Sequence, residues 1–548
     1  MSAFETMLAR DRARELVARG LWRDETLAQY LDRWATKRAD RTAMVDGAGR
    51  CTWRELAARV ERVAYGLAAH GVTAGRVIAC QLPNWSEFVV VLLAAERLGA
   101  VVNPIPPIYR ASELRFMLNR LQSAAVVIPG VFRGFDHVAM LDALRPQVPC
   151  LEHVFVARGT PGPGMQSFDA LTDTAWEARP GRRGLPGTDP SAVHEVIFTS
   201  GTTGEPKGVM HTPNTVLANV FPVLERLERS ERDVILMAST FAHQTGYLYG
   251  YCALLALGAT GVWLDVWSAE TAARLVERER VTFTMGATPF LRDLTYVPGR
   301  HDFSSLEVFI SAGAPIPRPL VADARTRLGC AISPGWGMSE NGLVTCVAPG
   351  DAEEKVLGTD GSPARGMELA IVDADDRLLP PDVEGELLVR GASQFLGYYQ
   401  RADFTRDSHT ADGWFRTGDR GRLDRDGYLS ITGRTKDLII RGGENIPVAE
   451  VESVLFTHPK VNGVAVVGMP DARLGERACA FVIPKAGAAL TLAELVAWLD
   501  AHQLARQKFP ERLELVDEFP LTPSGKIQKY RLRQSIAERL AREQREGR

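Results

Sequence analysis

The sequence predicts an α/β protein made of a large N-terminal region and a small α+β unit at the C-terminus. Over about the first 430 residues, strand-like apolar runs alternate with helical patterns, as in mainly parallel sheets covered by helices. After about Gly361 the pattern becomes strand-rich, which predicts a β subdomain. From Leu438 onward, two strand patterns and a capped helix predict a separate compact unit. We therefore expect two helix-covered sheets, a β subdomain and a small α+β unit, in that order.

The N-terminal elements begin with a helix that follows a capping box. Thr52 and Glu55 supply the two capping residues. The apolar side chains that follow recur on one helical face: Leu56, Val60, Val63 and Leu67. A strand at 76–82, a helix at 85–98 and a strand near 101–102 come next. Further strands are expected at 234–236, 281–285 and 308–311.

Residues 246–264 form a run without charged side chains, close to the length that spans a membrane. Gly250, Gly258 and Gly261 interrupt this run, and a charged residue, Asp265, follows it. We favour a buried helix that ends at Gly258 and a strand at 259–264 over a membrane span.

The C-terminal third shows the turn signals and caps of short elements. Turns are expected at 373–376 and 424–427 in the β subdomain. Strands are expected at 464–468 and 478–483, and Thr491 with Glu494 caps a helix. The highly charged segment 531–548 predicts a solvated terminal helix rather than a phosphate-binding tail.

Composition excludes several classes of protein. Lys plus Arg number 64 and Asp plus Glu 67, so the basic excess that nucleic acids and anionic membranes require is missing. The seven cysteines are scattered without CxxC spacing, which argues against a disulfide framework or a zinc site and favours reduced thiols in the cytoplasm. The N-terminus lacks the basic and apolar pattern of a signal peptide.

The most informative segment is Phe198-Thr-Ser-Gly-Thr-Thr-Gly-Glu-Pro-Lys207-Gly208, which follows a strand-like run. Glycines let backbone N–H groups turn toward an anion, hydroxyls add donors, and lysine adds a positive charge. The segment predicts a loop that binds a polyphosphate. It is not a Walker A loop, because GxxxxGK[ST] does not occur in the chain. A flexible Gly/Thr turn is the alternative for a short GTTG string.

With four later motifs, this loop resembles the adenylate-forming superfamily of acyl-CoA synthetases, adenylation domains and luciferases. The resemblance covers about residues 25 to 530 and all five motifs occur in the family's order. The later motifs are Trp336-Gly-Met-Ser-Glu340, Thr417-Gly-Asp419, Gly433-Arg-Thr-Lys-Asp437 with Gly442-Gly-Glu-Asn-Ile-Pro447, and Pro523-Ser-Gly-Lys526-Ile. The overall course of the chain, including Gly20-Leu-Trp-Arg-Asp24, is most similar to cyclohexanecarboxylate–CoA ligases.

The resemblance implies residues that bind ATP. Around the β- and γ-phosphates it implies Thr199, Ser200, Gly201, Thr202, Thr203, Gly204 and Lys207. It further implies α-phosphate binding by Ser339, a Mg²⁺ ligand in Glu340 and ribose binding by Asp419 with Arg434. Residues Ala312, Gly313 and Ala314 resemble the backbone that lies against adenine. Trp336, Gly337 and Met338 complete the expected nucleotide-binding set.

Chemically, an organic carboxylate is already ionised near neutral pH and attacks phosphorus without a general base. The enzyme must therefore hold two anions together, and the resemblance assigns Lys526 to the bridge between carboxylate and phosphate. Taken singly, Glu340 could cap a helix, Asp419 could be a turn residue and Lys526 a solvated lysine. Only their joint occurrence favours the functional interpretation.

The resemblance implies a second half-reaction, in which a thiol attacks the carbonyl of the acyl-adenylate. Because Lys526 would cover that carbonyl in the first half-reaction, a hinge is expected. By resemblance, Lys436 occupies the hinge, and Gly442 with Gly443 gives the pantetheine arm of coenzyme A close access to the backbone. We expect domain ranges of 1–432, a hinge at 433–437 and a mobile C-terminal lid at 438–548.

The acid pocket is expected near Phe241-Ala-His243-Gln-Thr-Gly-Tyr247. In salicylate-type enzymes an Asn follows the histidine and receives the 2-hydroxyl, whereas Gln244 stands here, which argues against a 2-hydroxyaryl acid. His243 is the expected gate, or else a core histidine. The remaining pocket residues implied by the resemblance are Gln244, Tyr247, Ala287, Thr288, Ser311 and Ala312.

We predict an ATP- and Mg²⁺-dependent ligase that makes an acyl-CoA through an acyl-adenylate, with an alicyclic, aryl or medium-chain acid as substrate. The alternatives are transfer to a carrier-protein thiol in trans, a luciferase-like oxygenase and an inactive adenylate-binding protein. Nucleic acid and membrane partners are not expected, and a homodimer is left open.

Overall fold

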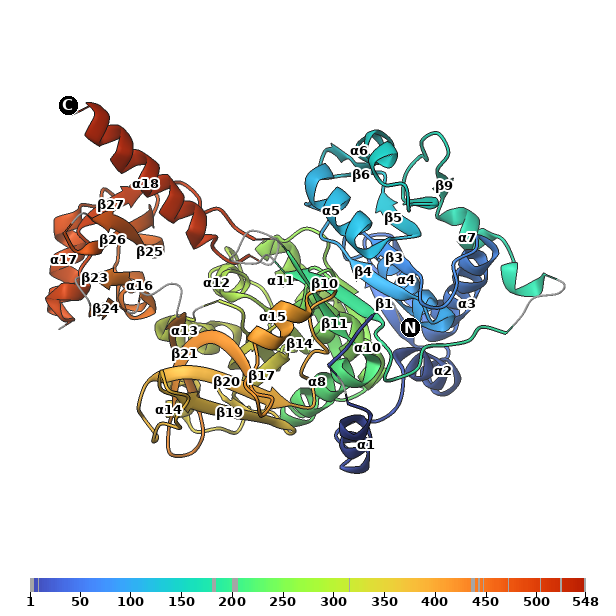
Figure 1. Ribbon diagram of the computed structural model, residues 1–548, viewed down its shortest axis with the longest axis horizontal. Helices are drawn as coiled ribbons and strands as arrows, with labels where there is room; N and C mark the ends of the chain where they lie inside the picture. The colour runs from blue at the N-terminus through green and yellow to red at the C-terminus, as the bar shows by residue number, and fades with distance from the viewer. Residues whose placement is uncertain are drawn as a thin grey trace.

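The computed structural model places two large sheets and their helices in one body, with a smaller unit at the C-terminal end (Figure 1). It describes residues 4–7, 9–179, 184–199, 206–314, 316–434, 439–441, 444–446, 448–471, 473–502, 504–522 and 525–546. The predicted α/β class, with a large N-terminal domain and a small C-terminal domain, is confirmed.

The first large sheet carries the strand that precedes the phosphate loop. All neighbouring strands in this sheet run parallel to each other, except for the antiparallel pair of β10 and β11. In the described residues the strands run in the order β11 (Lys207–His211), β10 (Glu195–Thr199), β4 (Val101–Pro104), β3 (Val77–Cys80), β5 (Ala125–Pro129), β8 (His153–Ala157) and β9 (Gln166–Ser167).

The second large sheet is parallel in its centre and antiparallel at both ends. Its order, for the described part of the chain, is β18 (Ser362–Pro363), β17 (Gly342–Cys346), β16 (Ala331–Met338), β15 (Val308–Ser311), β14 (Phe283–Gly286), β12 (Val234–Met237), β13 (Thr260–Trp263), β1 (Thr42–Asp46) and β2 (Gly49–Thr52). The strands expected at 234–236, 281–285 and 308–311 are all present, which confirms the alternating pattern.

Helices cover both sheets and fill the space between them. The predicted capping box of Thr52 and Glu55 opens α3, whose apolar face is buried. Nearly every side chain of α4 is buried, so this helix lies in the interior. The helices are α1 (Arg10–Ala18), α2 (Leu27–Lys37), α3 (Trp53–Ala69), α4 (Ser86–Leu98), α5 (Ala111–Leu121), α6 (His137–Leu144), α7 (Asp169–Asp173), α8 (Pro213–Arg226), α11 (Ala269–Glu279), α12 (Thr288–Thr295), α13 (Arg318–Leu328) and α14 (Glu353–Gly358).

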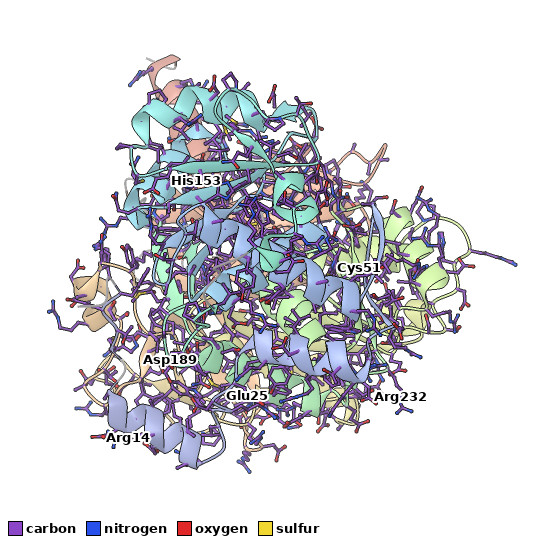
Figure 2. All side chains as sticks on the ribbon, turned by 90° about the vertical axis from the view of Figure 1, so that its right-hand side faces the viewer. Arg14, Glu25, Cys51, His153, Asp189 and Arg232 are labelled. Carbon is purple, nitrogen blue, oxygen red and sulfur yellow. The ribbon has the colours of Figure 1, made fainter. Side chains whose placement is uncertain are left out.

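Exposed charged side chains lie at the edge of this body. Figure 2 shows Arg14 on α1 at the edge of the molecule, and its side chain is 78% exposed. The two sheets and α4 share the apolar interior, in which a few carboxylates, such as Glu96 and Glu195, are also buried.

The uncharged run at 246–264 is folded into the core. It forms α9 (Gln244–Gly246), a π-helical segment (Tyr247–Cys252), α10 (Ala253–Leu257) and β13. Gly258 ends the helix with a φ of 69°, and a Cβ there would lie 2.5 Å from the Trp34 ring, so only glycine fits. The helix end and the strand were predicted, whereas the π-helical turn was not. None of the helices in the described residues has the length and apolar character that a bilayer span needs.

The β subdomain is an antiparallel sheet that follows the second large sheet in the chain. Its described strands are β19 (Met367–Val372), β20 (Gly385–Gly391), β21 (Phe415–Leu423) and β22 (Leu429–Arg434). Helix α15 (Ala402–Asp407) lies between β20 and β21 in sequence. The turn predicted at 424–427 joins β21 to β22, which brings Asp419 opposite Arg434.

The C-terminal unit is the predicted α+β fold. Strand pair β25–β26 is its longest ladder, and α18 packs an apolar stripe of Leu532 and Ile536 against it, with charged faces outward. In Figure 1 this unit lies to one side of the main body, orange to red. Its described elements are β23 (Ile439–Arg441), β24 (Glu444–Ile446), α16 (Val448–Phe456), β25 (Val461–Asp471), β26 (Gly475–Pro484), α17 (Leu492–Ala501), β27 (Arg512–Leu515) and α18 (Lys529–Glu546).

Candidate active site

The predicted phosphate loop joins two antiparallel strands. β10 ends at Thr199, β11 begins at Lys207, and these two residues lie opposite each other in the ladder. The turn between them, with Ser200, Gly201, Thr202, Thr203 and Gly204, lies outside the described residues. The Lys207 ammonium lies over two rings, 4.3 Å from the centroid of Phe404 and 4.9 Å from that of Tyr398.

The Trp336–Glu340 motif forms the turn of the β16–β17 hairpin. Gly342 has a φ of 67° and a Cβ at Gly337 would lie 2.2 Å from the Gly342 carbonyl oxygen, so the hairpin is too tight for side chains at these positions. This turn presents Ser339 and Glu340. One Glu340 carboxylate oxygen, Oε1, accepts a hydrogen bond of 2.8 Å from the Tyr398 hydroxyl.

The backbone of the same turn is fixed by His211 of β11. Burial lowers the pKa of His211 to about 4, so the ring is neutral at neutral pH. Its Nε2 lies 2.8 Å from the Ser339 carbonyl oxygen, which can only accept, so Nε2 carries the proton and donates it. The phosphate-loop strand and the Ser339 turn are therefore tied together.

Asp419 lies in a cluster of three predicted site residues. The Trp336 indole donates to Oδ2 at 2.8 Å and the Arg434 guanidinium donates to Oδ1 at 2.9 Å. The Thr417 hydroxyl accepts from the Asp419 N–H at 3.0 Å and donates to the Leu387 carbonyl. Asp419 is 5% exposed, so its charge is held by these donors in a site with little water.

Lys526 reaches this cluster from the C-terminal domain. It lies in a short turn in which its N–H donates to the Thr522 hydroxyl at 3.0 Å. A Cβ at Gly313 would lie 3.3 Å from Lys526 Cε and 3.8 Å from Nζ, so the lysine stem packs on the Gly313 backbone. Burial, and then the Arg434 charge, lower the pKa of Lys526 to about 8, while Asp419 and Glu340 act in the opposite direction.

His243 begins the predicted acid pocket and is neutral. Burial, followed by the nearby charge of Lys526, lowers its pKa to about 3. Its Nδ1 accepts the Thr245 N–H at 3.2 Å as the cap of α9, which leaves the proton on Nε2. His243 can therefore orient a group by a hydrogen bond but supplies no positive charge.

The other predicted pocket residues lie at strand ends and on α9. The Gln244 amide donates to Glu195 Oε2 at 3.2 Å, and the Tyr247 hydroxyl lies 2.8 Å from His194 Nε2. Burial raises the pKa of Glu195 to about 8, so the carboxyl is largely protonated at neutral pH. Ala287 follows β14 and Thr288 begins α12, while Ser311 ends β15 and Ala312 follows it. Ala314 accepts from the Thr288 hydroxyl at 3.4 Å.

Besides His211, sequence reasoning missed two residues at this site, Glu195 and Tyr398. Glu195 begins β10, and a carboxyl group at the start of a buried strand was the signal that could have revealed it. Tyr398 carries no such signal, because an aromatic residue after a glycine is common in any β subdomain. Both contact residues that are distant in sequence: Glu195 contacts Gln244, and Tyr398 contacts Glu340 and Lys207.

The predicted hinge and coenzyme A residues cannot be placed. Arg434 ends β22, while Lys436, Gly442 and Gly443 lie outside the described residues.

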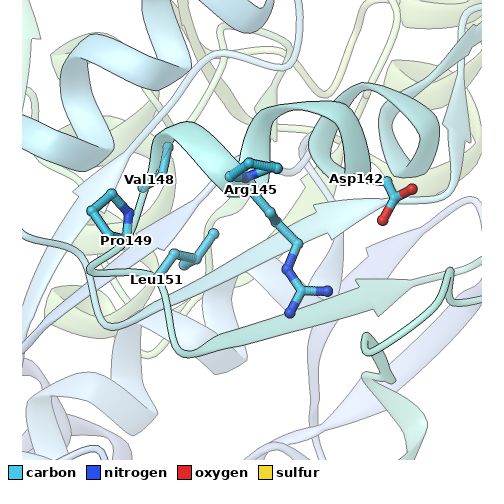
Figure 3. Close-up of a pocket in the computed structure, with 6 residues that line it drawn as sticks. Asp142, Arg145, Val148, Pro149 and Leu151 are labelled. Atoms are coloured by element: carbon cyan, nitrogen blue, oxygen red, sulfur yellow. The ribbon is translucent and has the colours of Figure 1, made fainter.

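Two surface hollows lie away from these residues. One of about 410 Å³ is lined by Asp142, Arg145, Pro146, Val148, Pro149 and Leu151 (Figure 3). Another of about 700 Å³ follows the outer face of α5 and includes Arg115 and Arg120. Neither is lined by a predicted site residue, so the candidate site is the cluster around Asp419 and Lys526.

Comparison with known proteins decides the family. The profile described as AMP-binding enzyme matches residues 31–399, and that of the AMP-binding enzyme C-terminal domain matches residues 450–526. The chain belongs to the AMP-binding enzyme family. This assignment makes it an ATP-dependent, AMP-forming ligase that activates a carboxylic acid.

Relatives within the AMP-binding enzyme family align along almost the whole chain. A medium-chain fatty-acid–CoA ligase of Escherichia coli is 36% identical, with 96% of this chain and 93% of the relative covered. A 2,3-dihydroxybenzoate-AMP ligase of Bacillus subtilis is 35% identical, with 95% of both covered. The crystal structure of ATP-bound MatB from Rhodopseudomonas palustris superposes with a TM-score of 0.83 at 28% identity and covers 93% of this chain and 99% of MatB.

Proposed function

We propose that this AMP-binding enzyme converts a small carboxylic acid, ATP and coenzyme A into an acyl-CoA through an acyl-adenylate. The observation that carries the proposal is the position of Lys526. This cation from the C-terminal domain lies on the Gly313 backbone. Burial and then the Arg434 charge lower its pKa, while the charges of Asp419 and Glu340 oppose that shift. One site therefore gathers the groups that a nucleotide and an acid both need.

In the first step, an oxygen of the ionised acid attacks the α-phosphorus of ATP and pyrophosphate leaves. No proton moves, so the protein needs positive charge and positioning rather than a base. Lys207 would hold the outgoing phosphates, Lys526 would bridge the carboxylate and the α-phosphate, and the Ser339 hydroxyl would donate to that phosphate. Asp419 would accept from the ribose hydroxyls while Arg434 and Trp336 keep its carboxylate in place.

Magnesium fits the residues present. Mg²⁺ bound with ATP usually takes one or two protein carboxylates and the phosphates rather than a protein cage. In the described residues no group of three or more His, Cys, Asp or Glu side chains could hold a metal ion, whereas Glu340 offers one buried carboxylate at the β16–β17 turn. Glu340 would hold the ion, which neutralises phosphate charge when bound.

In the second step, the thiol of coenzyme A attacks the acyl carbonyl and AMP leaves. With Lys526 on the Gly313 backbone, it would cover that carbonyl, so the C-terminal domain would have to move. We assign the hinge to residues 433–437 with Lys436 as pivot, the domains to 1–432 and 438–548, and the pantetheine passage to Gly442 and Gly443. The separate match of the C-terminal profile to residues 450–526 supports this division.

The acid is proposed to be compact and largely apolar: cyclohexanecarboxylate or another alicyclic acid, an aryl acid or a medium-chain acid. The pocket candidates are uncharged. The Gln244 amide N–H donates to Glu195, and the Gln244 carbonyl oxygen has no hydrogen-bond partner among the described residues. The similarity to a medium-chain fatty-acid–CoA ligase agrees with such a substrate.

The test is a panel of carboxylic acids assayed for acid-dependent pyrophosphate release, then for acylation of coenzyme A or of a carrier protein. We expect alicyclic or medium-chain acids to give the fastest release and coenzyme A to be acylated. Acylation of the carrier protein in place of coenzyme A would establish the alternative, a stand-alone adenylating enzyme. A cytoplasmic location and homodimerisation stay predictions.

A further inference from the structure

One aromatic ring joins two of the residues assigned above to ATP. The Tyr398 hydroxyl donates to Glu340 Oε1 at 2.8 Å, and the Lys207 ammonium lies 4.9 Å from the centroid of the same ring. Lys207 comes from β11 and Glu340 from the β16–β17 turn, which belong to different sheets. Tyr398 is therefore the physical link between the phosphate-loop lysine and the carboxylate assigned to the metal.

The ring of Tyr398 is held from several sides. Its backbone N–H donates to the Thr405 hydroxyl at 2.9 Å, and its backbone bridges to Val209 of β11. The Phe395 ring packs edge-on with centroids 4.8 Å apart, and Tyr398 is 5% exposed. A side chain fixed in this way donates along one direction, so it selects one orientation of its acceptor.

The Glu340 carboxylate is fixed by the same region of the chain. Its backbone carbonyl accepts the Phe395 N–H at 2.7 Å, and the residue is 8% exposed. The tyrosine hydroxyl occupies Oε1, and within the described residues no hydrogen bond engages the second carboxylate oxygen, which has lone pairs for another ligand. Burial, and the Glu340 charge next to it, raise the pKa of Tyr398 far above neutral pH, so the hydroxyl keeps its proton.

We propose that Tyr398 is a positioning residue for the ATP-bound cation: its hydroxyl fixes Glu340 so that the second oxygen meets the cation, while its ring face keeps Lys207 beside the phosphates. The inference rests on the proposed metal role of Glu340. Hydrogen-bond partners of metal ligands typically account for a 10- to 100-fold effect on metal affinity. The ring face adds an electrostatic attraction for the ammonium that does not depend on the hydroxyl.

The test measures cation binding without turnover. Mn²⁺ replaces Mg²⁺ as the probe, the enzyme is saturated with a non-hydrolysable ATP analogue, and free Mn²⁺ is counted by its electron paramagnetic resonance signal. Tyr398→Phe removes the hydroxyl and keeps the ring. We expect its Mn²⁺ dissociation constant to rise about tenfold, with an unchanged melting temperature and unchanged affinity for the analogue in the absence of metal.

Two comparison variants make the result decisive. Tyr399→Phe removes a neighbouring hydroxyl, whose contact is to the Gln400 amide, and should leave Mn²⁺ binding unchanged. Glu340→Gln should weaken Mn²⁺ binding at least as much as Tyr398→Phe. If Glu340→Gln weakens binding and Tyr398→Phe does not, the positioning role of Tyr398 is wrong. If neither weakens it, the metal role of Glu340 is wrong and the proposed function must be revised there.

A third variant tests the ring. Tyr398→Leu removes hydroxyl and ring together, so we expect weaker binding of the metal-free analogue in addition to the loss seen with Tyr398→Phe. Equal metal-free affinities for the Phe and Leu variants would overturn the part of the proposal that concerns Lys207. For the hydroxyl, excess Mn²⁺ should restore the adenylation rate of Tyr398→Phe, which a general structural defect would not permit.

Discussion

The side chain of Lys526 packs on the backbone of Gly313, with Cε 3.3 Å from the position that a Cβ would occupy there. These two residues come from the C-terminal domain and from the segment that follows β15. Contact between them brings a lysine that is more than two hundred residues away in sequence to the expected adenine-binding segment. The arrangement is the one that the proposed first half-reaction would need.

Gly313→Ala should slow adenylation, because its Cβ would displace the Lys526 stem. A displacement that costs about 1.4 kcal/mol in the transition state lowers the rate about tenfold. Gly313 also has a φ of 86°, so part of the effect is backbone strain. Gly329→Ala is the matched control, since Gly329 has a φ of 67° and no heavy atom within 4 Å of a Cβ. Equal loss of rate in both variants, measured by pyrophosphate release, would rule out the Lys526 contact as the cause.

The adenylation rate should fall as the pH rises through about 8. The pKa of Lys526 is lowered to about 8, and only its protonated form can bridge two anions. Bound substrates add negative charge, so kcat should decline at a higher pH than kcat/KM. In Lys526→Arg the guanidinium stays charged, and the alkaline decline should disappear even if the maximal rate is lower. A decline that persists in the arginine variant would assign the titration to another group.

Glu195 should make the protein less stable as the pH rises from about 4.5 to about 8. Burial raises the pKa of this carboxyl from 4.5 to about 8, so the folded state binds the proton more tightly than the unfolded state. The contribution of Glu195 to the free energy of unfolding is therefore fully present below pH 4.5. It is lost progressively as the pH rises to about 8. Glu96, whose pKa burial raises to about 7, contributes in the same direction.

Glu195→Gln should remove a large part of that pH dependence and keep the hydrogen bond with Gln244. Urea unfolding at pH 6 and pH 8 measures the difference. The stability of the variant relative to the parent should be higher at pH 8 than at pH 6, because the parent keeps losing stability over this range. Glu354→Gln, at an exposed position of α14, is the control that should match the parent at both values. A parallel pH dependence in Glu195→Gln and the parent would contradict the buried, protonated carboxyl.

Trp336→Phe should raise the KM for ATP by roughly tenfold, because loss of a hydrogen bond to a charged group costs about 1.5 kcal/mol. The indole N–H holds Asp419 Oδ2, and without it the Arg434 guanidinium is the side-chain donor left to this carboxylate among the described residues. The KM for the acid should change little. A change confined to the acid would place Trp336 in the acid pocket instead.

Much of the fold was predictable because its signals are local. The capping box at Thr52, the strand at 308–311 and the helix end at Gly258 each depend on residues within one or two turns of chain. The π-helical segment at Tyr247–Cys252 was not predicted, since it adds one residue to a turn without changing the apolar pattern.

For the site, the motifs indicated which residues to expect there, but not which other side chains form hydrogen bonds with them. Trp336 was predicted to contact nucleotide, yet its bond to Asp419 joins residues from two sheets. Tyr398 was missed because it acts across a tertiary contact that no sequence spacing encodes. The carboxyl of Glu195 at the start of a buried strand was a signal, but its contact with Gln244 could not be predicted from sequence spacing. The roles of Ser200, Lys436 and Gly442 stay predictions.

The role of Lys526 as the bridge between acid and nucleotide is tested most directly by measuring the two half-reactions of Lys526→Ala separately. Exchange of labelled pyrophosphate into ATP reports the first step, and thioester formation from supplied acyl-adenylate reports the second. We predict that exchange in the parent requires the acid and falls by about a hundredfold or more in the variant, while thioester formation stays near the parental rate. Unchanged exchange, or an equal loss in both assays, would contradict the account.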